Sequence, residues 1–400
     1  MDKNWYFMLN CEMRKLLALT AASALFTSTF LGTSSQAATK PVVNPLPSTL
    51  PVNVNGVITF ANAEANFAQI PEVAWKRTQE VINQNPAVSI PTTIDIGPNT
   101  LASKTAILSG LDRLNKLFAG FRHVPSYTGI VYNAQDQLWA QQDAAKVFKK
   151  LGTKSSFARP ENIKQQVQAG CEMKGAEAVN CGGGMSWDLR DGKSEAGGSY
   201  YGVQSDLVNG TPANYWLDAG KNVGPMTQVN HEGTHNYQIT QFYNTPLGRN
   251  QNTSSDIAHA FCPWWFSEGH ANAIGISTFM ETLPDYLNVR NSNVTNPPGP
   301  RTQIPSFTAS GLKTLLTSKQ IASPENPNYM LGYSIGMAAV EALSAIGGPQ
   351  STLALYTLGA KGEKWDVAFK HVYGISWEEG STVLSKVLAA EYAAKPMGQR

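Results

Sequence analysis

The chain has 400 residues, of which 42% are hydrophobic and 15% are charged, and its formal net charge is +2 at pH 7. This length and composition are ordinary for a soluble enzyme with one large domain or two lobes. The basic residues are scattered rather than clustered, so the electrostatic surface expected of a nucleic-acid-binding protein is missing. We therefore expect no nucleic-acid partner.

The N-terminus has the pattern of an export signal. Arg14 and Lys15 precede an apolar run at 16–32, and small residues suited to cleavage follow the run. We expect residues 1–37 to be a signal peptide, with Met13 as the better start because it leaves a compact basic region. The apolar run is at the short limit for crossing a bilayer, so we expect a secreted, extracellular protein without a stable membrane anchor.

Export permits disulfide bonds, which changes how the cysteines are interpreted. Cys171 and Cys181 lie in a glycine-rich segment, where a disulfide between them would close a local loop. Cys262 is then left as the odd cysteine. A catalytic thiol is one interpretation of Cys262, but its aromatic neighbours favour a buried free thiol.

The pattern of apolar residues divides the rest of the chain into three parts. The Pro-rich residues 38–58 predict an extended linker. From 59 to 245, helical and strand patterns alternate and predict a mixed α/β lobe, whereas 246–400 predict a mainly helical lobe. The strand patterns lie at 92–96, 127–133, 197–204 and 213–220, and the main helical patterns lie at 73–84, 104–121, 263–283, 332–347, 349–360 and 365–373.

The motif with the most specific chemistry is HEGTH, within a predicted helix at 226–242. His231 and His235 are four residues apart, so both imidazoles project from one face of the helix and can reach one metal ion. Glu232 lies beside them, where it could take a proton from a metal-bound water. A helix whose histidines merely pack is the alternative, and catalytic zinc needs a third protein ligand besides these two.

The third ligand is suggested by WWFSEGHANAIG at 264–275. HEGTH followed by WFSEGHA resembles the gluzincin metallopeptidases, the superfamily of thermolysin, the bacterial collagenases and the zinc aminopeptidases, whose second helix carries W-x-x-E-G. The resemblance implies that His231, His235 and Glu268 bind Zn²⁺ and that Glu232 is the general base. It also implies an α+β fold with a gluzincin-like catalytic core. In that fold an α/β N-terminal lobe with an antiparallel edge strand and a helical C-terminal lobe enclose the zinc site.

Other ligand sets are alternatives to this one. The gap between His235 and Glu268 is longer than in thermolysin-like and aminopeptidase-type members. It resembles that of collagenase-like members and of several other secreted branches better, and it establishes no specific branch. A metzincin pattern fails because glutamines occupy its glycine position and its third histidine position. His270 and His259 remain rival ligands. His123 and His371 belong to no motif, and we expect them to be structural.

Two further residues are candidates around the same site. Tyr333 begins YSIGMAAVEALSAIGG, which resembles the Y-x-x-G helix of many gluzincins, where the tyrosine hydroxyl stabilises the oxyanion. Tyr329 begins an overlapping match and is the alternative. Asn272 lies one turn after Glu268 and could hydrogen-bond a ligand histidine.

These features predict a secreted zinc-dependent metallopeptidase that hydrolyses peptide bonds in a protein or peptide substrate, with Glu232 activating a zinc-bound water. A hairpin at 198–220, with Asn209-Gly210 in its turn, precedes the zinc helix; in gluzincins an edge strand here pairs with the substrate. The carboxylate that anchors a free amino terminus in aminopeptidases is absent near Met185, so we expect an endopeptidase. The alternatives are a secreted non-catalytic binding protein that retains the fold and a structural protein in which HEGTH is only a core helix. Nothing in the sequence indicates an oligomeric state.

Overall fold

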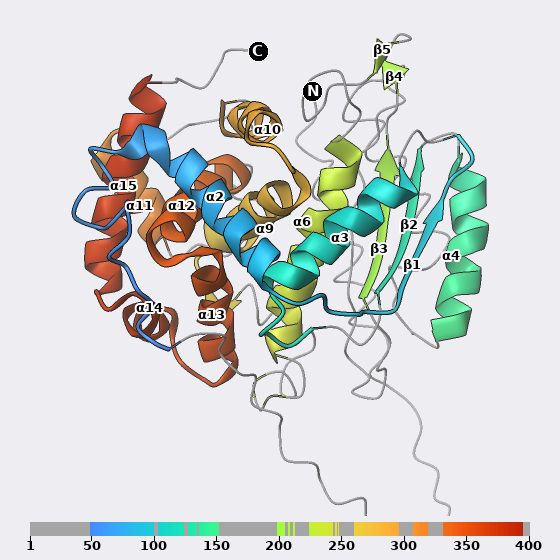
Figure 1. The fold of residues 1–400 in the computed structure, drawn as a ribbon, viewed down its shortest axis with the longest axis horizontal. Helices are drawn as coiled ribbons and strands as arrows, with labels where there is room; N and C mark the ends of the chain where they lie inside the picture. Colours follow the sequence, from blue (N-terminus) through green and yellow to red (C-terminus); the bar gives the residue numbers. More distant parts are fainter. Residues whose placement is uncertain are drawn as a thin grey trace, which may run out of the picture.

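The computed structural model contains a small sheet flanked by helices and a larger helical body (Figure 1). The residues that it describes are 49–99, 103–123, 127–133, 136–151, 198–204, 207–208, 211–212, 224–242, 245, 247, 260–295, 307–318 and 331–394. The expected signal peptide, most of the expected linker, the Cys171–Cys181 pair, Tyr329 and His259 lie outside these residues.

Among the described residues, the sheet has three parallel strands in the order β1-β2-β3, with β1 at Thr92–Ile96, β2 at Tyr127–Asn133 and β3 at Gly198–Gln204. These strands confirm three of the strand predictions, but the expectation of an antiparallel edge strand is wrong for β3, because it runs parallel to β2. Helix α3 (Lys104–Leu117) connects β1 to β2, and α4 (Gln137–Leu151) follows β2. Strands separated by helical crossovers pair in parallel, and strand patterns in the sequence do not reveal the direction of pairing.

A short antiparallel pair follows the sheet. Strand β4 (Leu207–Val208) pairs with β5 (Thr211–Pro212), so the two strands flank the predicted Asn209-Gly210 turn. This antiparallel pair agrees with the predicted hairpin, whereas residues 209 and 210 themselves lie outside the described residues. The strand predicted at 213–220 lies outside the described residues.

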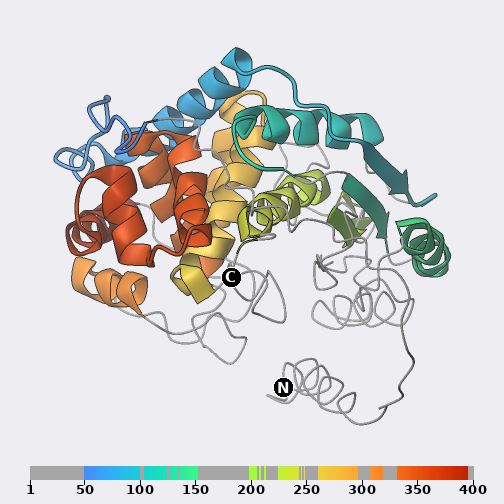
Figure 2. The same ribbon diagram turned by 90° about the horizontal axis from the view of Figure 1, so that it is seen from below.

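Most of the described residues after 245 are helical, as predicted, and none of them lies in a strand. The elements of the helical body are η1 (Phe67–Gln69), α2 (Ile70–Gln84), α6 (Gly224–Phe242), α9 (Trp264–Phe279), α10 (Leu283–Thr295), α11 (Ala309–Thr317), α12 (Leu331–Gly347), α13 (Pro349–Ala360), α14 (Trp365–Tyr373) and α15 (Trp377–Ala394). Helix α9 lies between α6 and α12 (Figures 1 and 2) and is buried on all sides from Trp264 to Thr278. A helix without a solvent-facing side is a core element.

Glycines allow α9 and α12 to approach each other closely. A Cβ atom on Gly269 would lie 2.2 Å from the carbonyl carbon of Gly336, and a Cβ atom on Gly336 would lie 2.3 Å from the carbonyl oxygen of Trp265. Both distances are far below van der Waals contact. The residue before Gly269 is Glu268, so this crossing sets where that carboxylate lies.

Helices α2 and α3 hold the C-terminal end of α9 through side chains that donate to its last carbonyl groups. Trp75 Nε1 donates to Met280 O, Gln79 Nε2 to Ser277 O, and Arg113 Nε to Thr278 O, at 3.0, 2.8 and 2.7 Å. Arg77 holds α12 in the same way, with Nη1 2.8 Å from the carbonyl oxygens of both Ala345 and Ile346. These bonds satisfy carbonyls that have no partner within their own helix.

A buried ion cluster ties α10, α12 and α15 together. The guanidinium of Arg290 donates to Glu341, at 2.8 and 2.6 Å, and to Glu391 Oε1, at 2.6 Å, and the Tyr286 hydroxyl donates to Glu341 Oε1. A buried charge is tolerated when it is paired and hydrogen-bonded in this way.

Cys262 is a buried thiol, as predicted, with its Sγ 3.5 Å from the hydroxyl oxygen of Tyr356. Burial raises the pKa of this thiol to about 12, although the hydrogen bond with Tyr356 opposes the shift. A thiol with such a pKa is a poor nucleophile.

None of the described helices is by itself long and apolar enough to cross a membrane. Helices α12 and α13 would meet that test as a pair by length and composition, but they are joined at a bend of 102°.

We predict that Gly336→Ala lowers the free energy of unfolding by about 1–3 kcal/mol, because the added methyl group forces α9 and α12 apart. Gly56→Ala is the matched control, since a Cβ atom there meets nothing closer than 3.7 Å. Urea denaturation of both variants measures the difference. A Gly336→Ala protein as stable as the control would contradict the close crossing.

Candidate metal centre

Helices α6 and α9 cross at a second glycine, and this crossing brings the candidate ligands together. A Cβ atom on Gly275 of α9 would lie 2.7 Å from the backbone nitrogen of His231. Asn230 braces α6 at the same level, because its Nδ2 donates to Gly110 O at 2.9 Å and to Thr278 Oγ1 at 3.0 Å. The two helices are therefore held in a fixed register.

His231, His235 and Glu268 form one cluster, with three ligand atoms at the corners of a small triangle. The distance between the two histidine Nε2 atoms is 3.1 Å, and Glu268 Oε2 lies 3.4 Å from His231 Nε2 and 3.2 Å from His235 Nε2. Tetrahedral zinc binds nitrogen and oxygen at about 2.0–2.2 Å, which puts ligand atoms roughly 3.3–3.5 Å apart. The cluster thus has the size and the donor atoms to hold a metal ion.

The ring of His231 is oriented by an amide from α9. Its Nδ1 lies 2.7 Å from Asn272 Oδ1, and Asn272 Nδ2 donates to the carbonyl oxygen of Tyr333 at 3.0 Å. Because a carbonyl oxygen can only accept, the amide nitrogen of Asn272 must face Tyr333, and its oxygen is left to accept from His231 Nδ1–H. The proton is then on Nδ1, and the Nε2 lone pair faces the cluster. The hydrogen bond expected from Asn272 is confirmed.

The ring of His235 is oriented in the same way by an amide from α6 itself. Its Nδ1 lies 2.9 Å from Gln238 Oε1, and Gln238 Nε2 donates to the carbonyl oxygen of Ser267 at 3.0 Å. The Nε2 lone pair of His235 therefore also faces the cluster. A hydrogen bond from the second ring nitrogen is typical of histidines that bind metals.

The electrostatics of the cluster favour a cation between the three groups. Burial acts to lower the pKa of His235, but the charge and hydrogen bond of Glu268 outweigh it and raise that pKa to about 9. Burial acts to raise the pKa of Glu268, but His235 and His231 hold it well below its usual range. Two imidazole lone pairs and a carboxylate repel one another at these distances. A proton or a metal ion must therefore lie between them to offset this repulsion.

Glu232 is buried on α6, one position after His231. Its negative charge contributes to the raised pKa of His235. It also adds to the raised pKa of Tyr127 on β2, although burial is the larger cause there. The structure therefore places a second carboxylate within electrostatic range of the cluster.

Tyr333 stands at the beginning of α12, and its ring is stacked on the imidazole of His231, with centroids 6.1 Å apart and planes at 13°. The residue proposed for the oxyanion is thus next to a candidate ligand. The alternative, Tyr329, lies outside the described residues.

His270 is not one of the grouped ligands. It is buried, stacks on Phe266 with centroids 5.6 Å apart, and has its Nδ1 2.8 Å from Gln238 Nε2. Burial lowers the pKa of His270 to about 3, so the ring is neutral. Two further histidines that the structure describes are exposed, namely His123 and His371, which contacts Glu363 at 3.1 Å.

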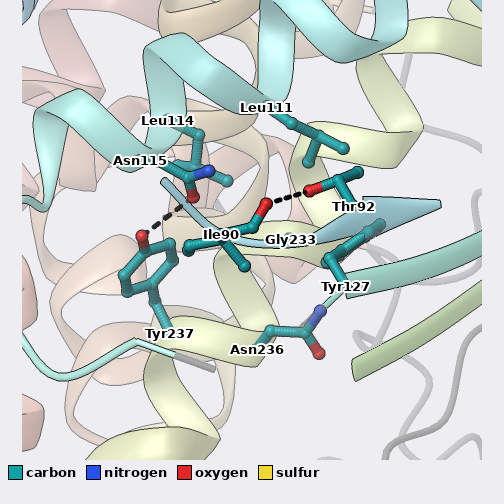
Figure 3. A pocket seen from close by; sticks show the side chains of 9 residues that line it. All are labelled: Ile90, Thr92, Leu111, Leu114, Asn115, Tyr127, Gly233, Asn236 and Tyr237. Atoms are coloured by element: carbon teal, nitrogen blue, oxygen red, sulfur yellow. Dashed lines mark hydrogen bonds between the residues drawn. The ribbon is translucent and has the colours of Figure 1, made fainter. Parts of the chain in front are cut away.

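A cavity lies on the other side of α6, between this helix, α3 and the sheet (Figure 3). It is lined by Ile90, Thr92, Leu111, Leu114, Asn115, Tyr127, Gly233, Asn236 and Tyr237. Gly233 and Tyr237 each follow a ligand histidine by two positions, which turns them about 200° away from the metal-facing side. The cavity has a volume of about 10 Å³, enough for one water molecule, and is too small for a substrate.

Sequence patterns missed the role of Gln238 and Ser267. The signal that could have found Gln238 is its spacing of three residues from His235, which places both side chains on one face of α6. Ser267 contributes mainly its backbone carbonyl, and a backbone group has no signature in the sequence.

No family model, curated protein or solved structure matches the chain. The chemical interpretation of the cluster therefore depends on its geometry and on the two sequence motifs.

We predict that the purified chain binds about one divalent metal ion and that His235→Ala abolishes this binding, because two ligands cannot complete the site. Elemental analysis after dialysis against a weak chelator measures the metal content. His371→Ala is the control, since this histidine is exposed and should leave the metal content unchanged. Equal metal content in the His235→Ala variant and the wild type would rule out this cluster as the site.

We predict that Asn272→Leu weakens metal binding by about 10–100-fold, because His231 loses the acceptor that holds its tautomer. Asn272→Asp keeps an acceptor oxygen for His231 but loses the donor to the Tyr333 carbonyl oxygen, so we expect a smaller loss of affinity than in Asn272→Leu. Competition with a chromophoric chelator measures both affinities. Equal losses of metal affinity in the two variants would show that the hydrogen bond from His231 to residue 272 does not contribute to metal binding.

Proposed function

We propose that the protein is a zinc metallopeptidase that cleaves internal peptide bonds of protein or peptide substrates. The observation that carries this proposal is the triangle of His231, His235 and Glu268, with Glu232 on the same helix as the two histidines. Two imidazoles and one carboxylate are a ligand set of catalytic zinc sites. Softer thiolate-based sites and all-oxygen magnesium or calcium sites use other donors.

The number of ligands favours a catalytic rather than a structural zinc. The group contains three ligand residues among those that the structure describes. Structural zinc sites are closed by four protein ligands, whereas catalytic sites keep one position for water or substrate. His231 is also partly exposed at the cluster, which is compatible with access from solvent.

Zinc bound at this site would supply a Lewis acid that polarises the scissile carbonyl group and lowers the pKa of a coordinated water. Glu232 accepts a proton from the attacking water and passes it to the nitrogen of the departing amine, while the carbon–nitrogen bond breaks. The hydroxyl of Tyr333 donates a hydrogen bond to the negative oxygen that develops on the carbonyl. Asn272 and Gln238 keep the two histidine rings in the tautomer that the site needs.

Two parts of this proposal, the cleavage of internal bonds and the secreted location, depend on the sequence. The aminopeptidase motif lacks its anchoring carboxylate near Met185, so this segment of the sequence does not favour the selection of a free amino terminus. The export signal predicted at 1–37 would direct the enzyme out of the cell.

We predict that Glu232→Gln retains zinc but lowers kcat for peptide cleavage by at least about 100-fold, because the amide cannot accept the proton. Glu72→Gln, at a partly exposed position on α2, is the matched control and should cleave normally. Mass spectrometry of products from a peptide library and from an unfolded protein measures cleavage. Normal cleavage by the Glu232→Gln variant would contradict the role of Glu232 as the general base.

The same assay separates the proposal from its alternatives. Products cut inside the chain support an endopeptidase, whereas sequential loss of single terminal residues would indicate an exopeptidase. A wild-type protein that binds zinc and cleaves neither substrate would be a non-catalytic binding protein instead.

A further inference from the structure

Gln238 is fully buried, and both atoms of its amide are hydrogen-bonded on two sides. The oxygen Oε1 accepts from His235 Nδ1–H at 2.9 Å and from the Ser267 hydroxyl at 3.2 Å. The nitrogen Nε2 donates to the Ser267 carbonyl oxygen at 3.0 Å and to His270 Nδ1 at 2.8 Å. The amide is therefore fixed in a single orientation.

His270, in contrast, is surrounded mainly by aromatic rings. It is 0% exposed, and its ring lies among those of Phe118, Phe266 and Tyr356. Its Nε2 has no hydrogen-bond partner among the described residues. A buried N–H without a partner is destabilising, so a phenylalanine would fit this aromatic environment better. The polar contact that distinguishes His270 from a phenylalanine is the bond from Gln238.

We propose that His270 is a positioning residue of the metal centre that acts through Gln238 on His235. If the Gln238 side-chain amide were flipped, its nitrogen would face His235 Nδ1 and its oxygen would face the Ser267 carbonyl. His235 would then carry its proton on Nε2 and could not bind the metal. In the tautomer with its proton on Nε2, His270 offers an acceptor at Nδ1 that only the amide nitrogen can satisfy, so this tautomer opposes the inverted orientation. The inference rests on the metal centre of the proposed function.

This relay, from His270 through Gln238 to His235, makes metal binding depend on the packing of α9 against α6. Within six positions, α9 supplies the ligand Glu268, the Ser267 and His270 groups that orient Gln238, and the Asn272 amide that orients His231. A histidine that does not touch the metal thus controls one that does.

The test compares two substitutions of His270 in the full chain. His270→Phe keeps the aromatic packing but removes the acceptor. His270→Asn keeps an acceptor, because its Oδ1 takes the place of Nδ1, but loses the aromatic packing. We expect His270→Phe to weaken zinc binding by about 10–100-fold and His270→Asn to stay within about threefold of the wild type, by competition with a chromophoric chelator.

A double-variant cycle checks that the effect passes through Gln238. Gln238→Met should weaken zinc binding at least as much as His270→Phe, and adding His270→Phe to Gln238→Met should cause no further loss. Additive losses, or unchanged affinity in His270→Phe, would overturn the relay. Urea denaturation of the metal-free variants is the control for packing: His270→Phe should be at least as stable as His270→Asn.

These results are separable from those that concern the proposed function. A wild-type chain that binds no zinc would overturn both the metal centre and the relay. Zinc binding that is weakened only in the variants without the acceptor, in a protein that cleaves no peptide, would support the relay while rejecting the hydrolase.

Discussion

The structure depends on the close packing of α9 between α6 and α12. Glycine is required at both crossings: Gly275 lies against the backbone of His231, and Gly269 lies against Gly336. Because backbones rather than side chains meet there, the three helices have little freedom to slide or rotate. Side chains from α2 and α3 then hold the C-terminal carbonyls of α9. A carboxylate on α9 can therefore lie within 3.4 Å of two histidines on α6 without any flexible loop in between.

This rigidity explains why the polar groups of the site can be buried at all. A carboxylate and two imidazoles lose their hydration inside the protein, and the loss is offset only when each group keeps well-aligned partners. Each histidine has an amide oxygen on Nδ1, and each amide is in turn fixed by a backbone carbonyl. The site is thus preorganised by α6 and α9 and by the start of α12, where the Tyr333 carbonyl holds Asn272. Glu232 and the ring of Tyr333 stand beside it.

Much of the fold and the site could be predicted from local sequence patterns. Apolar spacing predicts the helices, and two short motifs, each on one helix, indicate His231, His235 and Glu268. The direction of β3 could not be predicted, because strand patterns do not say whether pairing is parallel. The relay through Gln238 was missed because it depends on a register between helices far apart in the sequence. For the same reason, nothing in the sequence indicated that Arg290 would be paired with both Glu341 and Glu391.

The most direct test of the metal centre is X-ray absorption spectroscopy at the zinc edge on the zinc-loaded wild-type chain. We expect four nitrogen or oxygen ligands at about 2.0–2.1 Å, two of them imidazoles, and no sulfur. A zinc–sulfur distance near 2.3 Å, or zinc with no imidazole scattering, would contradict the assignment of His231, His235 and Glu268 as the ligands.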